Sequence, residues 1–497
     1  MEYRIFPAIG IARIGNSPDM FVGPEVIGSH GRDIATGGET EMQDFKDTAF
    51  QVKKQAARFH LYQRAPGTTA FVPVALPPGA SVRWTVRVAN KKDAIQRPSA
   101  PPPTIPTGGL RPTLDPARAN RLIDPGNVSI SGASAAGVFL DGTHVGNPVR
   151  LGELRTDAFG RLLVLGGPGI SRSTPPSPIG GSFYDNPNWH DDVADGVVSA
   201  EFVDANGQVT MATSAWVIIG PPDFAPGAES VVSLYDEVQQ LAVDHSWWPK
   251  PTTTSFTQDV YPILRRARSL RWSHGRKNLA GTVVSEQTWN NISDDYPHLA
   301  NAAASEMTFR AQQQALVLKI ETLLVDYSLT AIQKDHLQRW AAGTFASDWT
   351  GTPPIPASPS PASLTESALR GTAGQGFYPG IEGGRILMDP SIYMMPFDFR
   401  IDPTVLTPGD VTALMAQPWQ ADFLKCSGSW WPSQRPDIAP QPGNAFKLWA
   451  RIGPAGAPPN HQQLVDHVMQ FGFVTPRFVG GTEVCLEEGR DTAAVGN

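Results

Sequence analysis

Cysteine is scarce in this sequence: two residues, Cys426 and Cys485, occur in 497. Two cysteines cannot form the several cross-links of a disulfide-stabilised scaffold, so we expect each to matter only through its own chemistry. Charge is also low, because Asp, Glu, Lys and Arg make up 18% of the chain, and Lys+Arg 40 against Asp+Glu 47 give a net charge of -7. The chain therefore lacks the basic excess that attracts polyanions, and we expect no nucleic-acid partner.

Long hydrophobic runs are missing as well. No stretch approaches the ~18–20 apolar residues that a membrane span requires, and short runs such as 215–220 end at glycine or proline. The first residues include Glu2, Pro7 and Gly10 where a signal peptide would carry an uninterrupted apolar segment. We therefore expect a soluble cytoplasmic protein without a membrane partner, and export by a route other than Sec stays open.

Several common catalytic motifs do not occur. Gly-X-Ser-X-Gly and His-Glu-X-X-His are both absent, which argues against the commonest hydrolases and metalloproteases. The glycines of 166–169 follow a strand-like segment, but Pro168 and the lack of a following helix favour a turn over a nucleotide-binding loop.

The glycine, proline and hydrophobic content favours a fold with many turns around a hydrophobic core. Gly 47 and Pro 47 accompany 41% hydrophobic residues, and the length exceeds the ~250–300 residues at which one core stops growing. Residues 71–74, 82–88 and 214–219 are strand-like, whereas apolar residues recur every three to four positions after about residue 256. We expect an α+β fold with an antiparallel β-rich N-terminal domain, 1–250, and a helical, loop-rich C-terminal domain, 251–497, that houses the site.

Local signals refine the C-terminal half. Thr330 with Gln333 three residues later forms a capping box, which predicts a helix that ends near Gly343. Residues 352–363 are rich in proline and serine and predict a loop or linker, as do residues 99–109. A further amphipathic segment covers 461–471.

The most unusual stretch is 418–437, which combines three tryptophans, an aspartate and one of the two thiols. Asp422 and Cys426 are four residues apart, so one helical turn would place both side chains on one face within ~6 Å. The carboxylate could then take a proton from the thiol or from a substrate. The alternative is a buried aromatic cluster with a structural cysteine and a solvated aspartate.

A second candidate is 184–196, which contains several carboxylates and a single histidine, His190. These ligand types suit a metal, but their spacing fits no known metal motif. A polar turn between strands is the better interpretation, and we expect no metal. The helical His461, Asp466 and His467 are expected to be ordinary surface residues.

Several stretches together resemble the family of L-lysine epsilon-oxidase and glycine oxidase, whose members carry cysteine tryptophylquinone, a cofactor built from their own Cys and Trp side chains. The strongest piece is Pro418–Asp437, where Pro-Trp-Gln-Ala-Asp-Phe leads to Cys and Trp-Trp-Pro. The other pieces are Pro7–Ser17, Leu151–Asp157, Trp189–Gly196, Tyr261–Leu264 and Phe377–Glu382.

The resemblance implies an oxidoreductase that deaminates an amino acid or related amine, consumes oxygen and releases hydrogen peroxide and ammonia. Independently of the resemblance, His190 is a further candidate acid or base together with Asp422. The resemblance implies that Cys426 supplies the thiol half of the quinone and that Asp422 sits beside it. It also implies a flavoprotein maturation partner, and a homo-oligomer stays open.

The sequence departs from the family at this site. Val468 stands where the cross-linked Trp is expected, Gln470 where lysine oxidase has a histidine, and 371–374 lacks an expected cysteine. A quinone would then need Trp430, Trp431 or Trp449, and the last of these is the only tryptophan after the Cys motif. Two further hypotheses remain: a quinone-less enzyme that uses the same pocket on an amino-acid-like substrate, and a non-catalytic binding protein.

If valine replaces an indole, the volume of the missing ring must either be filled by other side chains or remain as a cavity. Either Met469, Phe471 or Trp449 fills it, or it remains a ligand pocket. We expect a pocket bordered by Val468, Cys426 and Asp422, because a carboxylate beside an apolar plug would be poorly solvated.

Overall fold

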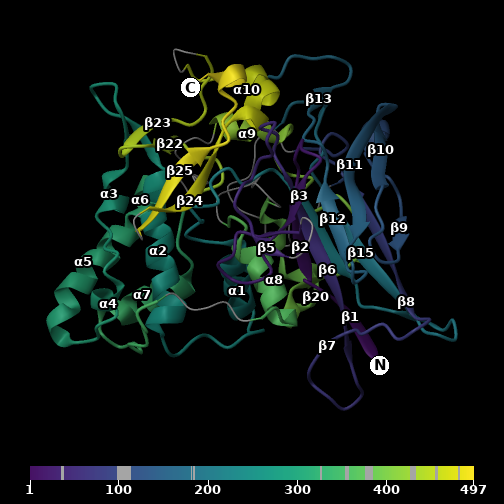
Figure 1. The fold of residues 1–497 in the computed structure, drawn as a ribbon, viewed down its shortest axis with the longest axis horizontal. Coiled ribbons are helices and arrows are strands. Elements are labelled where there is room, and N and C mark those ends of the chain that lie inside the picture. Colours follow the sequence, from purple (N-terminus) through teal and green to yellow (C-terminus); the bar gives the residue numbers. More distant parts are fainter. Residues whose placement is uncertain are drawn as a thin grey trace.

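The computed structural model of the chain describes residues 1–34, 39–97, 113–180, 182, 185–324, 327–352, 358–374, 384–425, 433–453, 457–479 and 482–496. A large twisted sheet forms one side of the molecule, helices form the other, and the C-terminal hairpins lie between them (Figure 1). Cys426, Trp430 and Trp431, and the predicted loop 99–109, lie outside the described residues. The expected α+β class is confirmed.

Nine strands form the main path of the sheet, and six shorter ones join it at the sides. Their order is β10 (Val138–His144), β11 (Asn147–Thr156), β12 (Leu162–Gly166), β6 (Lys54–Arg64), β2 (Ile9–Arg13), β17 (Ala215–Gly220), β15 (Ala194–Val203), β8 (Ser81–Ala89) and β9 (Val128–Ser131). The shorter ones are β1 (Glu2–Phe6), β3 (Met20–Val22), β4 (Arg32–Asp33), β5 (Thr40–Glu41), β7 (Val72–Pro73) and β16 (Val209–Met211).

Burial explains how these strands pair. In β8 the side chains alternate from Ser81 to Val88, so that Val82, Trp84, Val86 and Val88 are buried while the residues between them are exposed or half-buried. Both β2 and β17 are buried along their whole length, as strands covered on both faces are. These two pair in parallel, as do β3 and β6, so the predicted antiparallel arrangement holds for the other strand pairs but not for these.

The helices begin at α1 (Leu234–Asp244) and continue through the second half of the chain. They are α2 (Tyr261–Ser269), α3 (Gln287–Asn290), α4 (Tyr296–Leu299), α5 (Met307–Leu318), α6 (Ile320–Leu323), α7 (Ala331–Ala341), α8 (Pro361–Arg370), α9 (Trp419–Lys425), α10 (His461–His467) and α11 (Thr492–Val495). The predicted capping box of Thr330 and Gln333 is confirmed at the start of α7. The predicted linker 352–363 extends too far, because Ser360 caps α8, which begins at Pro361.

Five two-stranded pairs complete the described structure. They are β13 (Arg172–Ser173) with β14 (Trp189–His190), β18 (Gly275–Lys277) with β19 (Val283–Ser285), β20 (Tyr393–Met395) with β21 (Arg400–Ile401), β22 (Ile438–Gln441) with β23 (Ala445–Leu448), and β24 (Phe473–Val479) with β25 (Thr482–Glu488).

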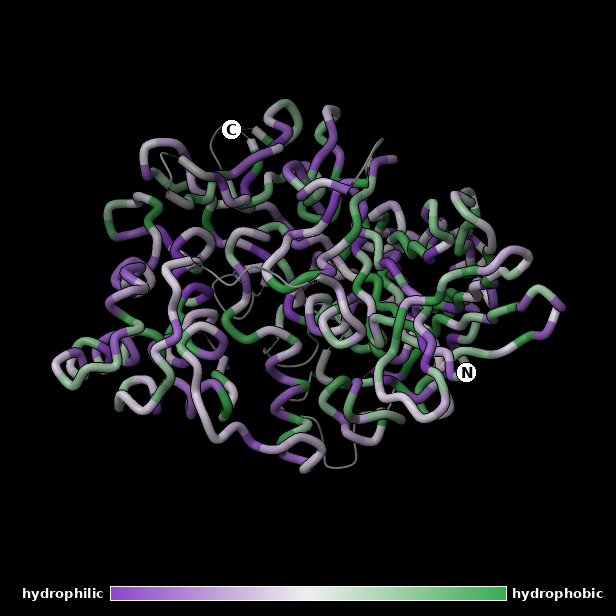
Figure 2. Tube along the Cα trace, turned by 60° about the horizontal axis from the view of Figure 1, so that its bottom comes forward, coloured by the Kyte–Doolittle hydropathy of each residue, from purple (hydrophilic) through white to green (hydrophobic). Residues whose placement is uncertain are grey.

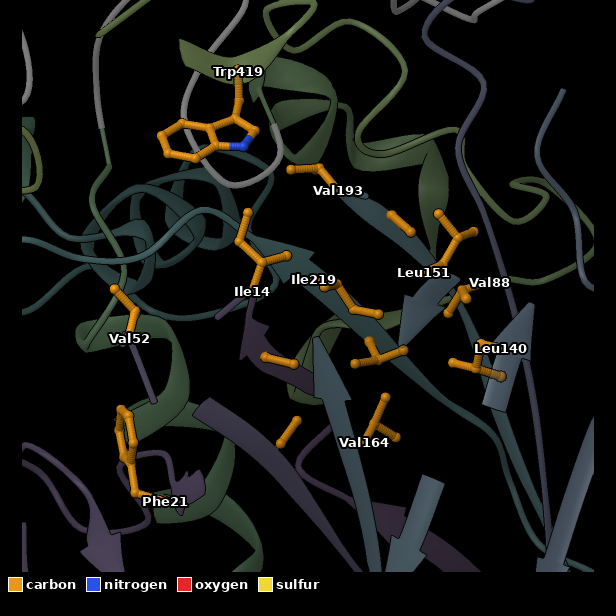
Figure 3. Close-up of a cluster of buried hydrophobic side chains, with 14 of the residues drawn as sticks. Ile14, Phe21, Val52, Val88, Leu140, Leu151, Val164, Val193, Ile219 and Trp419 are labelled. Atoms are coloured by element: carbon orange, nitrogen blue, oxygen red, sulfur yellow. The ribbon is translucent and has the colours of Figure 1, made fainter. Parts of the chain in front are cut away.

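The largest apolar core joins distant parts of the sequence. Its members come from the central strands and also from α9, α10 and β24, and the tube in Figure 2 shows hydrophobic segments concentrated among the strands. Trp419 of α9 belongs to this core together with Ile14 and Val193, as Figure 3 shows. A second cluster lies within the helices of 256–340. The domain limits at residues 250 and 251 stay a prediction.

Candidate active site

Helix α9 carries Asp422 into the interior. The helix follows Pro418, and Trp419 and Phe423 pack in the core with their rings 4.9 Å apart. Asp422 is 1% exposed, so the predicted alternative of a solvated aspartate is wrong. Helix α10 packs against α9, which brings the region of Val468 close to this helix. Because Cys426 lies outside the described residues, its approach to Asp422 stays a prediction.

A buried carboxylate fixes the start of α9. Asp191 accepts hydrogen bonds from the backbone N–H of Trp419 at 2.9 Å and from Lys92 Nζ at 2.5 Å. The same Nζ donates to the carbonyl of Ala416 at 2.9 Å, and Asn90 donates to Asp191 from the other side. All three polar side chains of this arrangement are withdrawn from solvent, so the segment that leads into α9 has little freedom to move.

Gln417 and Asn186 add a second connection just before the helix. Gln417 Nε2 donates to the carbonyls of Asn186 and Trp189 at 3.0 and 2.6 Å, and Asn186 Nδ2 donates to the carbonyl of Gln417 at 2.9 Å. The Trp189–Gly196 and Pro418–Asp437 motifs, 228 residues apart at their closest contact, are therefore parts of one structural unit.

The acidic stretch around His190 joins β14 to β15, as expected of a polar turn between strands, and its carboxylates are buried. Asp191, Asp192 and Asp195 are all buried, because their carboxylates accept hydrogen bonds from backbone and side-chain groups of other segments. Burial, together with the charge of Asp191, raises the pKa of Asp192 to about 7. Burial raises the pKa of Asp195 to about 6, although Thr412 lowers it by donating to the carboxylate.

His190 is placed against a second histidine. Its ring centroid is 4.5 Å from that of His144, whose Nε2 lies 3.0 Å from Asp93 Oδ2. Burial, with a contribution from His144, lowers the pKa of His190 to about 4, so its imidazole is neutral at pH 7. A neutral imidazole can accept a proton, and the catalytic role of His190 stays a prediction.

The position predicted for the missing indole is closed by apolar packing. Val468 is fully buried in the same core as Trp449 and Phe471, whose rings are 5.1 Å apart. The Trp449 indole donates its N–H to the carbonyl of Gly472 at 2.8 Å and packs on Phe224 at 5.0 Å. Gln470 is half-buried, and its Oε1 lies 2.6 Å from Nδ1 of His467.

A cavity of about 770 Å³ lies beside the segment that carries the Cys motif. Ser433 and Gln434, in the second half of the Pro418–Asp437 motif, line it, and so do Gly371, Thr372 and Ala373. Its other walls come from β2, from the loops around β3 and β5, and from α2, α8 and β24. Asp422, His190, Trp449 and Val468 are not among the described residues that line it.

One wall of this cavity carries charges of alternating sign. Glu229 accepts from Arg265 at 2.9 Å and from Arg266 at 3.3 Å, Arg266 also pairs with Asp236, and Arg370 joins Asp236 to Glu366. Burial raises the pKa of Glu229, but the positive charges of Arg265 and Arg266 outweigh this effect. The pKa falls to about 2, so the carboxylate stays ionised. Alternating Arg and Glu can hold the carboxylate and the ammonium of a zwitterion.

Sequence reasoning did not find this cavity. Its charged residues are scattered between Arg13 and Arg477 and form no motif. Of the stretches quoted for the resemblance, Pro7–Ser17, Tyr261–Leu264 and Pro418–Asp437 contribute lining residues.

Two models of one family match the chain: the L-lysine epsilon oxidase N-terminal domain over residues 6–219 and the L-lysine epsilon oxidase C-terminal domain over 319–449. Together they cover more than half of its length. The chain belongs to the L-lysine epsilon-oxidase family. The C-terminal match includes Asp422, Cys426 and Trp449 but ends before Val468, so the matching of Val468 to the cross-linked Trp stays a prediction.

Individual relatives agree with this assignment. L-lysine 6-oxidase of Marinomonas mediterranea is 25% identical over 534 residues, which cover 86% of this chain and 71% of that protein. The crystal structure of the L-Lys epsilon-oxidase from the same organism has a TM-score of 0.75 at 19% identity and covers 98% of this chain and 95% of that one. The structure of its Schiff base intermediate with L-Lys gives a TM-score of 0.74 at 20% identity, covering 99% and 95%.

These comparisons confirm the predicted family and place the chain among enzymes of the amino-acid oxidase type. The likeness to the solved structures confirms the fold. Within the described residues, no helix is both long and apolar enough to cross a membrane.

Proposed function

We propose that this protein oxidatively deaminates an amino acid or a related amine, consuming oxygen and releasing hydrogen peroxide and ammonia, with its substrate bound in the 770 Å³ cavity. The observation that carries the proposal is the position of this cavity. Ser433 and Gln434 of the Pro418–Asp437 motif line it, together with an alternating set of arginines and glutamates that suits a zwitterion.

The family's cysteine tryptophylquinone supplies a carbonyl that a substrate amine attacks and an acceptor for the substrate's electrons. The chain does not fit this group at position 468, because valine has no ring to oxidise or cross-link. We therefore derive no step through a quinone at that position. An oxidase activity requires an indole elsewhere, and Trp449, close to α9 through Phe224 and Phe423, is the candidate within the described structure.

For Asp422 we propose the role of acid or base beside the thiol. Its burial on α9 supports this role, since a carboxylate withdrawn from water is easily shifted between its charged and neutral forms by a neighbouring group. His190 is proposed as a supporting catalytic residue, on the ground of its burial against His144, whose ring centroid is 4.5 Å away.

The test is oxygen consumption by the purified full-length protein, followed with an oxygen electrode while amino acids are added one at a time. Amino-acid-dependent oxygen uptake with matching peroxide and ammonia supports the proposal. No uptake with any of the twenty amino acids or simple amines, from protein shown to be folded by its thermal transition, would contradict it.

A second candidate is favoured by Val468: a family member without the quinone that uses the same cavity for another reaction on an amino-acid-like ligand, or that only binds it. Binding of amino acids without oxygen uptake, and without quinone absorbance, would support this second candidate. If the folded protein neither binds amino acids nor consumes oxygen with them, both candidate functions are contradicted.

A further inference from the structure

Arg435 is a buried cation beside the helix that carries Asp422. It is 7% exposed and belongs to the second half of the Pro418–Asp437 motif. Its Nε donates a hydrogen bond to the carbonyl of Phe423, the residue that follows Asp422. Phe423 is among the last residues of α9, where the backbone carbonyls have no partner within the helix. The guanidinium therefore satisfies the C-terminal end of α9 and places a positive charge there, which suits the helix dipole.

The same guanidinium connects α9 to Trp449. Its Cζ lies 5.8 Å from the centroid of the Trp449 ring, within the range of a cation–π contact. Its Nη1 donates to Oδ1 of Asp437 at 3.1 Å, and the carbonyl of Asp437 accepts the backbone N–H of Trp449 at 3.0 Å. Arg435 thus contacts both the helix of Asp422 and the indole that the proposed function names as a candidate.

Asp437 extends this connection into the helical half of the chain. Its backbone N–H donates to the carbonyl of Ser273 at 2.8 Å, and its Oδ2 lies 3.9 Å from Nε2 of His274. Nδ1 of His274 accepts the indole N–H of Trp289 at 2.9 Å, and Trp289 is a fully buried member of the second hydrophobic cluster. Trp449 belongs to the largest core, so the position of Arg435 is fixed from both cores.

Arginine suits this place better than lysine does. Its planar guanidinium holds five N–H donors in fixed directions, and here it donates to the carbonyls of Phe423 and Pro436 and to the carboxylate of Asp437. The ammonium of a lysine is a point charge on a flexible stem and cannot reproduce this planar set of bonds.

We infer that Arg435 is a positioning residue: it fixes the Asp422 end of α9 relative to Trp449 and so orients the carboxylate for proton transfer. It acts through the carbonyl of Phe423, and it is not among the described residues that line the cavity. Its loss should therefore lower kcat more than it raises KM. The orienting role rests on the proposed function for the part that Asp422 plays, whereas the fixing of α9 does not.

Hydrogen–deuterium exchange of the purified full-length protein, read by mass spectrometry, tests the fixing of α9. In Arg435→Ala we expect the amides of α9 to exchange about tenfold faster than in the wild type, the effect of losing one charge-assisted hydrogen bond, while those of β15 change less. Millimolar guanidinium, far below denaturing concentrations, should restore slow exchange by replacing the lost donor.

Arg310→Ala is the matched control. Arg310 is also buried and donates to backbone carbonyls, but it lies among the helices of the second cluster. Its substitution should leave the exchange of α9 relative to β15 unchanged. Unchanged α9 exchange in folded Arg435→Ala, or an equal effect of Arg310→Ala, would overturn the inference. Faster exchange that guanidinium does not reverse would also overturn it, because the vacated volume and not the lost donor would then loosen the helix.

Initial rates separate this inference from the proposed function. A kcat that falls about tenfold in Arg435→Ala, with little change in KM, supports both, and recovery of kcat with guanidinium shows that the cation itself is needed. An unchanged kcat despite faster α9 exchange would overturn the positioning role. No oxygen uptake by the wild type would refute the oxidase proposal and the orienting role, and exchange would still decide whether Arg435 fixes α9. If Arg435→Ala fails to fold, Arg435→Lys is measured in the same way and should show the same loss of α9 protection.

Discussion

Asp191 accepts the backbone N–H of Trp419 at 2.9 Å, so a carboxylate in the first half of the chain fixes the first residue of a helix 228 positions later. Lys92 stabilises this contact by donating to both Asp191 and the carbonyl of Ala416. Two separated sequence motifs are thereby joined at the helix that carries Asp422. This connection holds α9 against the strands of the first half of the chain.

Lys92→Met should destabilise the protein by about 3–5 kcal/mol, because it leaves the fully buried Asp191 carboxylate without its cation. The free energy of unfolding in urea measures the loss. Arg83→Met, which breaks the exposed pair with Glu201, is the matched control and should cost at most about 1 kcal/mol. Equal effects of the two substitutions would show that the Lys92 pair does not hold α9.

Asp192 makes stability depend on pH. Its folded-state pKa of about 7 exceeds the ordinary value of 3.8, so the folded protein keeps a proton that the unfolded chain loses. Its contribution is therefore fully present below pH ~4 and is lost as pH rises to about 7, at up to about 1.4 kcal/mol per pH unit.

Asp192→Asn cannot ionise and should gain stability relative to the wild type between pH 5 and 7, with no further change above pH 8. Thermal unfolding of both proteins across this range measures the difference. Asn can still accept from the backbone N–H of Gly169, so the local hydrogen bond is kept. A difference that is flat from pH 5 to 8 would mean that Asp192 is ionised throughout.

Much of the fold could be predicted from local patterns. The alternation in β8 and the capping box of α7 are local signals, and each marks its element correctly. The parallel pairing of β2 with β17 could not be predicted, because it depends on which buried strands meet after 200 residues of intervening chain.

Only the part of the candidate site that lies within a sequence motif could be predicted. Asp422 was found from its spacing to Cys426, whereas the alternating charges of Glu229, Arg266 and Arg370 have no common spacing and are assembled by the packing of α2 against neighbouring segments. The acids near His190 were predicted only to form a polar turn, because the sequence alone does not reveal the distant hydrogen-bond donors that make their burial possible.

Asp422→Asn should lower oxidase activity by a factor of about 10²–10⁴ if the carboxylate transfers a proton, since that is the usual contribution of such a group. Initial rates of peroxide formation measure the effect. Asp141→Asn, which removes an exposed carboxylate paired with Arg150 on β10, is the control and should leave the rate unchanged. A fully active Asp422→Asn protein would remove Asp422 from the mechanism.

The number of free thiols in the denatured protein shows whether Cys426 is cross-linked. If position 468 is the family's cross-linked position, no indole stands there, and titration of the denatured protein should detect both Cys426 and Cys485. Peptide mass analysis then finds no oxygen added to the tryptophans. A single thiol, with added oxygen on a peptide that contains Trp449, would show instead that the quinone is built on that residue.

Amino-acid-dependent peroxide release, measured side by side for the wild type and Arg265→Met, tests the account most directly. The account predicts peroxide formation by the wild type and a rise in KM of tenfold or more in Arg265→Met, because the substitution removes a cation from the charged wall of the cavity. No peroxide from the folded wild-type protein with any amino acid, or an unchanged KM in the variant, would contradict it.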